Sequence, residues 1–244
     1  MTSDKHIFKT YMKIRIGIAI LAVLLPLSLI SYGYFIDIGI QGSLSSYYHA
    51  SPDAHSYHDF HSIQKGQFLR TFFVGLLITI GALLYFYKGF HPKENIVLNF
   101  AGGFAVLVAL FPMHWEDSIG NVLFKAVEFG EWFSVHGISA VLLVFCVAYV
   151  CIFRPSKTTD LLKDEKLKNR LIILYNILGG LMILLPISIF VILSFFVKNG
   201  KAVIWVEIAV LVVFAIFWLA KSKEMSIIHK DNDSSDTLSS NFIS

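Results

Sequence analysis

Histidines and carboxylates gather in two polar segments of this 244-residue chain, at 37–67 and 113–133. The first segment contains four of the nine histidines, with Asp53 and Asp59 among them. The second segment and the start of the next apolar run add these residues: His114, Glu116, Asp117, Glu128, Glu131 and His136. Zn²⁺ binds imidazole and carboxylate at about 2.0–2.2 Å, so metal binding is the first chemistry that these residue types allow. A solvated acidic segment without a ligand is the alternative.

Three histidines of the first segment, His55, His58 and His61, follow one another at intervals of three residues. If residues 54–64 form a helix, His55 and His58 share one face, and Asp59 lies four residues after His55 on that face. Such pairs can place two ligands on one ion. An H-x-x-H-x-x-H pattern in a polar segment is not specific to metal sites, however, and solvated histidines are the alternative interpretation.

Three ionisable residues lie near the ends of apolar runs, where lipid and water meet. His136 lies about one turn into its run, so its ring must face protein or water. Arg70 opens an earlier run, and Glu207 lies about one turn into the last one. Ionisable groups inside a membrane indicate functional sites by default, but an Arg70–Glu207 ion pair would be purely structural. Both side chains could also extend to the interface.

Three serines in the first polar segment are candidate nucleophiles: Ser43, Ser45 and Ser46. No G-x-S-x-G motif surrounds them, so we do not expect an ordinary serine hydrolase. The chain also lacks the G-x-x-x-x-G-K-[ST] loop, the Rossmann glycine pattern and the H-E-x-x-H motif. We therefore do not expect nucleotide chemistry.

The elements that must position these residues are membrane-spanning helices. Hydrophobic residues make up 56% of the chain and the mean hydropathy is +0.68, above the roughly 45–50% of a soluble protein. A spanning helix needs about 20 apolar residues, and six runs qualify: 16–36, 68–87, 95–112, 134–153, 171–197 and 202–220. We predict an all-α polytopic membrane bundle over residues 1–230 and a disordered polar tail over 231–244.

The distribution of lysine and arginine predicts the orientation of this bundle. Fifteen of the 20 basic residues fall in the segments that share a side with the N-terminus. Because cytoplasmic loops carry the excess of Lys and Arg, both termini should be cytoplasmic. Both polar segments should then lie at the outer (periplasmic or extracellular) face of the cell membrane. The net charge of +3 then reflects orientation, so we expect membrane lipids as partners and no nucleic acid. The oligomeric state is not indicated.

Four stretches resemble an uncharacterised group of bacterial multi-pass membrane proteins with the pattern S-x-S-x-Y-Y-H, R-D-x-F-V-G, A-L-F-P and H-x-x-S-A. They are residues 43–49, residues 70–75 with 87–90, residues 101–103 with 108–112, and residues 135–140. The resemblance covers about the first 150 residues. Thr71 stands where that group has aspartate, so a role for that carboxylate does not transfer.

A more distant resemblance is to the alkaline ceramidase and adiponectin-receptor superfamily of membrane hydrolases. Ser45-x-x-x-His49 matches its S-x-x-x-H motif, whereas its H-x-x-x-H motif is missing and six expected helices replace seven. The resemblance implies a zinc ion on His49 and His136, with His114 as a third ligand. A zinc-bound water with a pKa near 7 would be the nucleophile. Asp59 and Ser45 would then be the catalytic residues.

Three functions stay open at this point. The first is a membrane protein without a cofactor, in which His49, Arg70, His136 and acidic neighbours form a polar network. The second is a zinc-dependent hydrolase of a lipid amide or ester at the outer leaflet. The third is a proton-linked transporter that uses Glu207 and the histidines as a relay.

Overall fold

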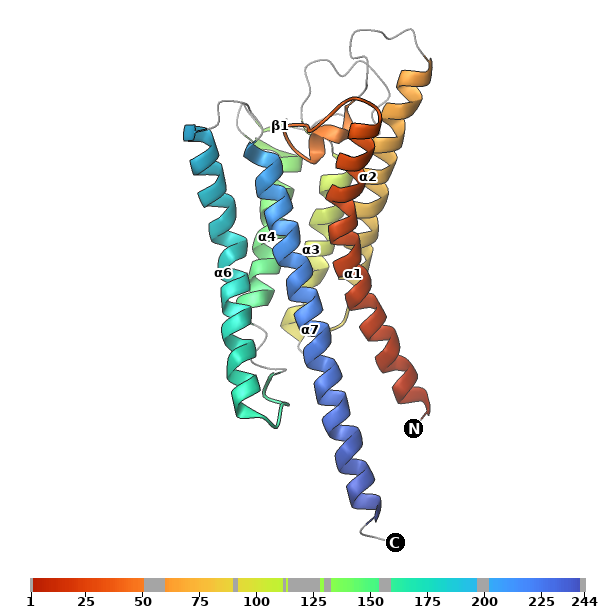
Figure 1. Ribbon diagram of the computed structural model, residues 1–244, viewed down its shortest axis with the longest axis vertical. Coiled ribbons are helices and arrows are strands. Elements are labelled where there is room, and N and C mark those ends of the chain that lie inside the picture. Colours follow the sequence, from red (N-terminus) through yellow and green to blue (C-terminus); the bar gives the residue numbers. More distant parts are fainter. Residues whose placement is uncertain are drawn as a thin grey trace.

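The computed structural model describes residues 2–50, 60–89, 92–111, 113, 128–129, 133–153, 159–196 and 202–241. In this part of the chain six α-helices run side by side (Figure 1): α1 (Thr2–Phe35), α2 (Phe60–Phe86), α3 (Pro92–Leu110), α4 (Val135–Phe153), α6 (Glu165–Phe196) and α7 (Ala202–Asn241). A 3-10 helix, η1 (Ser45–Tyr48), follows α1. The two-residue strands β1 (Glu128–Phe129) and β2 (Phe133–Ser134) pair antiparallel before α4. The expected all-helical bundle is confirmed.

Each of the six helices contains a segment long and apolar enough to cross a membrane: Phe8–Phe35, Gln67–Phe86, Pro92–Leu110, Val135–Phe153, Glu165–Ile189 and Val203–Lys230. Large apolar side chains cover the outside of the bundle. Phe35 and Phe86, for example, are 80% and 77% exposed. Such a surface would drive association in water, whereas hydrocarbon solvates it. The chain is therefore a multi-pass membrane protein whose helices contact lipid.

The helices extend beyond the apolar runs from which they were predicted. The largest extension is in α7, which continues to Asn241 and so includes most of the polar segment for which composition predicts disorder. A helix that already spans a bilayer is nucleated, and each further residue adds a hydrogen bond at small entropic cost. Polar composition alone does not capture this effect.

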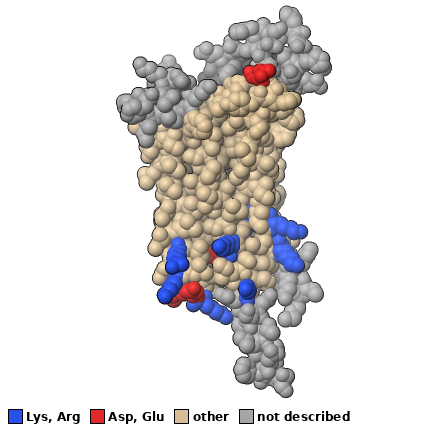
Figure 2. All heavy atoms as spheres, viewed as in Figure 1, with Lys and Arg blue, Asp and Glu red and all other residues tan. Residues whose placement is uncertain are grey.

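The helices pack in chain order as a closed ring. Consecutive helices contact one another from α1 to α7, and α7 returns to pack against α1. Both termini lie at the same end of the bundle (Figure 1). We call this the Arg15 end, because Arg15 is buried there, and the opposite end the Ser45 end, because η1 covers it. Lysines and arginines gather towards the Arg15 end on the face shown in Figure 2.

Helices α2 and α3 approach each other closely at Gly81 and Gly102. A Cβ atom at Gly81 would lie 2.8 Å from the Gly102 carbonyl oxygen, and a Cβ at Gly102 would meet the Gly81 carbonyl in turn. Because lipid gives no hydrophobic force between helices, such small residues allow backbones to gain van der Waals contact. The two glycines therefore fix α3, and with it the carbonyl groups that contact His136.

We expect Gly102→Ala to lower the thermal stability of the purified protein in detergent. The added methyl group meets backbone atoms, which cannot move aside as a side chain can, and overpacking of this kind typically costs about 1–3 kcal/mol. Gly103→Ala is the matched control, because nothing lies within 4 Å of its Cβ position. That change should leave stability unchanged or raise it by about 0.5–1 kcal/mol. Equal effects of the two variants would contradict the packing described here.

Candidate functional site

A sharp turn after α1 brings η1 over the end of the bundle. The turn contains two residues in the left-handed region, Asp37 (φ 60°) and Gly39 (φ 68°). The Ile38 N–H donates to the Gly33 carbonyl at 2.9 Å and closes the turn. Position 33 also leaves no room for a side chain, because a Cβ atom on Gly33 would lie 2.7 Å from the Tyr47 ring. The Tyr47 hydroxyl donates to the Gly39 carbonyl at 3.0 Å, which holds the loop closed.

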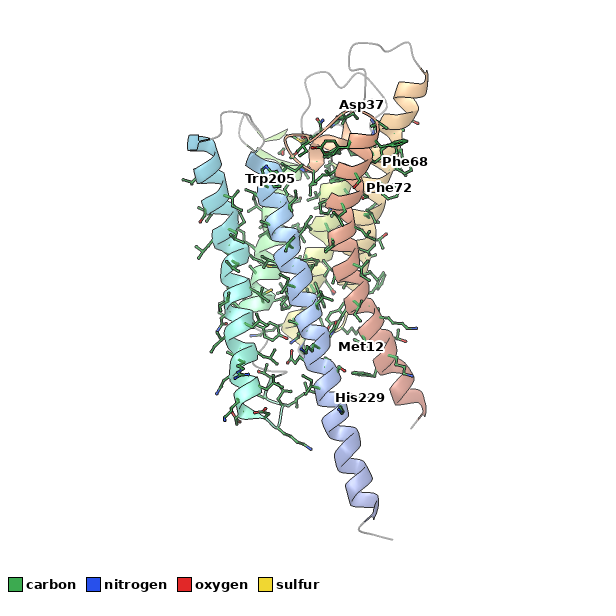
Figure 3. The ribbon with its side chains drawn as sticks, viewed as in Figure 1. Met12, Asp37, Phe68, Phe72, Trp205 and His229 are labelled. Carbon is green, nitrogen blue, oxygen red and sulfur yellow. The ribbon has the colours of Figure 1, made fainter. Side chains whose placement is uncertain are left out.

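Backbone hydrogen bonds fix this loop against the start of α7. The Ile204 N–H donates to the Gly42 carbonyl at 2.9 Å, and Figure 3 shows the start of α7, at Trp205, beside the loop. Within the turn, the Ser43 hydroxyl accepts from the Ser46 N–H at 3.0 Å and lies 2.7 Å from the Ser46 hydroxyl. All four residues of η1 are buried. The position of Ser45 is therefore set by backbone geometry.

The Ser45 hydroxyl lies between two ionisable side chains from different helices. Its Oγ is 2.9 Å from His136 Nε2 on α4 and 3.3 Å from Glu207 Oε1 on α7. The other carboxylate oxygen, Glu207 Oε2, accepts from the Leu44 N–H at 2.6 Å. Ser45 is 6% exposed and His136 is 8% exposed, so little bulk water competes for these bonds. We call this arrangement the Glu207–Ser45–His136 chain.

The far side of the imidazole fixes which nitrogen holds the proton. His136 Nδ1 lies 2.9 Å from the Phe111 carbonyl oxygen and 3.1 Å from the Val108 carbonyl oxygen. Carbonyl oxygens only accept, so Nδ1–H must donate to them. In the neutral ring, Nε2 is then the acceptor, and Ser45 is the group placed to donate to it.

The chain is fully hydrogen-bonded in two arrangements that contain the same number of protons. In the first, protonated Glu207 donates to Ser45 Oγ, and the Ser45 hydroxyl donates to neutral His136 Nε2. In the second, His136 is an imidazolium that donates to Ser45 Oγ, and the Ser45 hydroxyl donates to the Glu207 carboxylate. A concerted shift of two protons along the hydroxyl interconverts them. If one proton is removed, Ser45 has a single donor for two acceptors, so one buried acceptor loses its partner.

His49 and Arg70 lie beside this chain. His49 Nε2 donates to the Met113 carbonyl oxygen at 3.2 Å. Arg70 Nε donates to the Tyr48 carbonyl oxygen at 3.3 Å, and its guanidinium carbon lies 4.9 Å from the centre of the Tyr48 ring, a cation–π distance. Burial lowers the pKa of His49 from 6.5, and the charges of Arg70 and His136 lower this pKa further, against the hydrogen bond to Met113. These surroundings favour the neutral form of His49.

The structure brings most of the predicted site residues to one end of the bundle. Ser45 contacts both His136 and Glu207, and His49 and Arg70 lie beside these residues. The contacts of Arg70 and Glu207 given above go to Tyr48 and to η1, not to each other. Asp59 and His114 lie outside the described residues, as do His55, His58 and the side chain of His61.

The predicted zinc site is not assembled within the described part of the chain. No group of three His, Cys, Asp or Glu side chains there is close enough to hold a metal ion. Both ring nitrogens of His136 already contact protein atoms, and His49 Nε2 contacts a carbonyl oxygen. Zinc binding at His136 would require one of these bonds to break. The metal assignment stays a prediction, because His114 is not described.

The sequence indicates these residues but not how they are connected. Nothing in it predicts that Ser45 bridges His136 and Glu207, or that the Phe111 and Val108 carbonyls hold the imidazole. The available signal was Pro112. Proline has no N–H and disfavours a helical conformation in the residue before it, so carbonyl groups near the end of α3 are free to accept from a side chain.

The lowered pKa of His49 predicts a pH effect on stability. The unfolded chain takes up a proton near 6.5, whereas the folded protein resists it, so stability is full above 6.5 and falls as pH drops towards the folded pKa. We expect His49→Gln, whose amide can still donate to Met113, to lose less stability than the wild type on acidification. Thermal unfolding well above and well below this pH measures the difference. An equal loss in both proteins would contradict the assignment.

No family model, curated protein or solved structure matches this chain. The resemblances described from the sequence therefore stay predictions, and function has to be argued from the geometry of the site.

Proposed function

We propose that the protein is a proton-linked membrane transporter whose proton-binding element is the Glu207–Ser45–His136 chain. The observation that supports this proposal is the position of Ser45 Oγ, within hydrogen-bond distance of an imidazole nitrogen and a carboxylate oxygen at once. A hydroxyl in that position passes a proton from one group to the other without moving itself. The proton-linked alternative from the sequence used the same two ionisable residues, Glu207 and a histidine.

The orientation that we infer places this chain at the outer face, periplasmic or extracellular. Lysines and arginines gather towards the Arg15 end (Figure 2), and such residues resist transfer across the membrane. Both termini are then cytoplasmic, because both lie at that end (Figure 1). A proton that enters the Glu207–Ser45–His136 chain comes from the outer side of the cell membrane.

Because the surroundings of the Glu207–Ser45–His136 chain are of low polarity, the position of this proton strongly affects the free energy of the site. Two opposite charges in a poorly solvated site interact more strongly than in water, and an isolated charge is costly. The neutral arrangement and the ion-pair arrangement keep the same net charge, so proton transfer between them avoids an isolated charge. Loss of the proton does leave an isolated charge. Proton release is therefore coupled to a rearrangement of the end of the bundle. Such coupling is what a proton-linked transport cycle needs.

Proton flux into liposomes that contain the purified protein tests the proposal. An imposed pH gradient with a membrane potential drives the flux, and a pH-sensitive dye inside the liposomes reports it. We expect Ser45→Ala to reduce the flux at least tenfold, because the hydroxyl bridge is lost, and Ser45→Thr to retain most of it. An interaction of about 1.4 kcal/mol corresponds to this tenfold factor.

Ser43→Ala serves as the matched control, because it removes a hydroxyl from the same turn without contact with His136 or Glu207. This variant should keep its proton flux if it folds like the wild type. Flux in the wild type no greater than in empty liposomes, or equal flux in Ser45→Ala and Ser45→Thr, would overturn the proposal.

A second candidate function is acyl transfer on a membrane lipid, with Ser45 as the nucleophile. It is favoured by one observation: Ser45 and His136 Nε2 are 2.9 Å apart, and the opposite nitrogen is held by carbonyl oxygens. A general base next to a hydroxyl, oriented by a third group, is the arrangement that activates serine. The base would be His136, and the acyl group would come from a lipid ester or amide.

A serine-reactive fluorophosphonate probe separates this second candidate from the first. Covalent labelling of the wild type that disappears in Ser45→Ala and His136→Phe would support acyl transfer. If the folded wild type is not labelled at pH values where a neutral imidazole is present, the nucleophile assignment fails and the proton-transfer role is unaffected.

A further inference from the structure

A second set of buried charges lies at the Arg15 end, remote from Ser45. It consists of two cations, two carboxylates and two tyrosines from several helices, which we call the Arg15-end cluster: Arg15, Tyr87, Glu94, Tyr175, Lys221 and Glu224. Arg15, Glu94 and Lys221 are each 2% exposed, and Glu224 is fully buried. The formal charges of these four residues cancel. Charged groups buried in a membrane bundle are costly and are a functional-site hypothesis by default.

Arg15 joins α1 to the end of α2 and to α7. Its Nε donates to the Tyr87 hydroxyl at 2.9 Å, and its Nη1 donates to the Lys221 carbonyl oxygen at 2.9 Å. Its guanidinium carbon lies 5.3 Å from the centre of the Tyr87 ring. The Glu94 carboxylate lies against Gly89, where a Cβ atom would be 2.5 Å from Glu94 Oε2. This part of the cluster holds the helices together.

Lys221 and Glu224 form the second part of the cluster, one turn apart on α7. Lys221 Nζ is 3.4 Å from Glu224 Oε2 and lies over the Tyr175 ring, 5.4 Å from its centre. The Tyr175 hydroxyl donates to the same Oε2 at 2.6 Å. Hydrogen bonds of about 2.5–2.7 Å are typical of a hydroxyl that donates to an ionised carboxylate. Glu224 Oε2 is therefore the acceptor for the Tyr175 hydroxyl and for Lys221 Nζ.

The other oxygen of this carboxylate, Glu224 Oε1, is fully buried, and nothing among the described residues hydrogen-bonds to it. A buried carboxylate oxygen without a hydrogen-bond donor is disfavoured. The proton is the one cation that needs no cavity to reach it.

From these contacts we propose that Glu224 is a second proton-binding site of this protein, at the end opposite to Ser45, and that Oε1 takes the proton. The O–H bond forms at Oε1, and the carboxylate becomes neutral. Its ion pair with Lys221 then ends, so the cluster gains one positive charge unless Lys221 Nζ releases a proton in turn. Binding of a proton at Glu224 therefore loosens Lys221, and loss of a proton restores the pair.

The other titratable and charged groups around Glu224 and Lys221 come from each helix packed against them. Arg15 on α1, Tyr87 after α2 and Glu94 on α3 act on Lys221 or on one another, Tyr175 comes from α6, and Cys151 comes from α4. Cys151 contacts Met182 and forms no contact with Glu224. Glu94 is the only other carboxylate in the cluster, so a test has to separate the two acids.

A proton site at each end of the bundle would give a proton a place to bind on either side of the membrane. The role of Glu224 in transport rests on the proton-linked function proposed above, whereas its protonation does not. The two ideas can therefore fail separately.

Infrared difference spectroscopy of the purified full-length protein tests the proposal. A protonated carboxyl group absorbs at its own C=O stretching frequency and shifts in D₂O, so it can be followed while the pH is lowered over the range in which circular dichroism shows a folded protein. We expect Glu224→Gln to lose one such band that the wild type shows. The band should persist in Glu207→Gln and Glu94→Gln, and in Glu165→Gln, a control that changes a 75% exposed side chain.

A second variant keeps the test decisive if Glu224→Gln does not fold. Tyr175→Phe removes the donor to Oε2, so the Glu224 band should shift in frequency. The proposal is overturned if folded Glu224→Gln retains every carboxyl band, if the band disappears in Glu94→Gln instead, or if Tyr175→Phe leaves it unmoved. Loss of the band in Glu224→Gln without proton flux in wild-type liposomes would refute the transport function and leave this proton site standing.

Discussion

One hydroxyl proton on Ser45 is shared between two neighbours that can each accept it. Ser45 lies at a point where α4, α7 and the loop after α1 meet, and its position is fixed from the backbone. In water, a solvent molecule would donate a hydrogen bond to the second acceptor. In a buried site at the end of a membrane bundle, each polar group has to find its partner within the protein. The site is complete only when an extra proton is present on Glu207 or His136.

The rest of the structure can be understood as support for this contact. The glycine contact between α2 and α3 brings α3 close enough for its carbonyl groups to hold His136. The closed ring of helices places α7 next to α1, so the loop that leaves α1 reaches Glu207 directly. At the opposite end, Arg15 fastens the same two helices through the Lys221 carbonyl. α7 is thus held near its start through Glu207 and again about halfway along at Lys221, while the stretch between them packs against apolar neighbours.

Several of these features could be predicted from the sequence, and others could not. The six spans follow from apolar runs alone, because a bilayer imposes both length and composition. His136 and Glu207 stood out because ionisable groups are rare in such runs. Their contact through Ser45 could not be predicted, since residues so distant in sequence meet only through helix packing. Arg15 and Lys221 were interpreted as signals of orientation. Their burial with Glu94 and Glu224 depends on the same packing.

Coupling between His136 and Glu207 is the central claim, and a ¹⁵N NMR titration of the His136 side chain tests it most directly. We expect a neutral tautomer with the proton on Nδ1, and a protonation midpoint of His136 that changes when Glu207 is replaced by Gln. In Ser45→Ala this dependence on Glu207 should be much weaker, because the hydroxyl that connects the two groups is absent. A proton on Nε2 of the neutral ring, or a midpoint that is the same with and without the Glu207 carboxylate, would contradict the account.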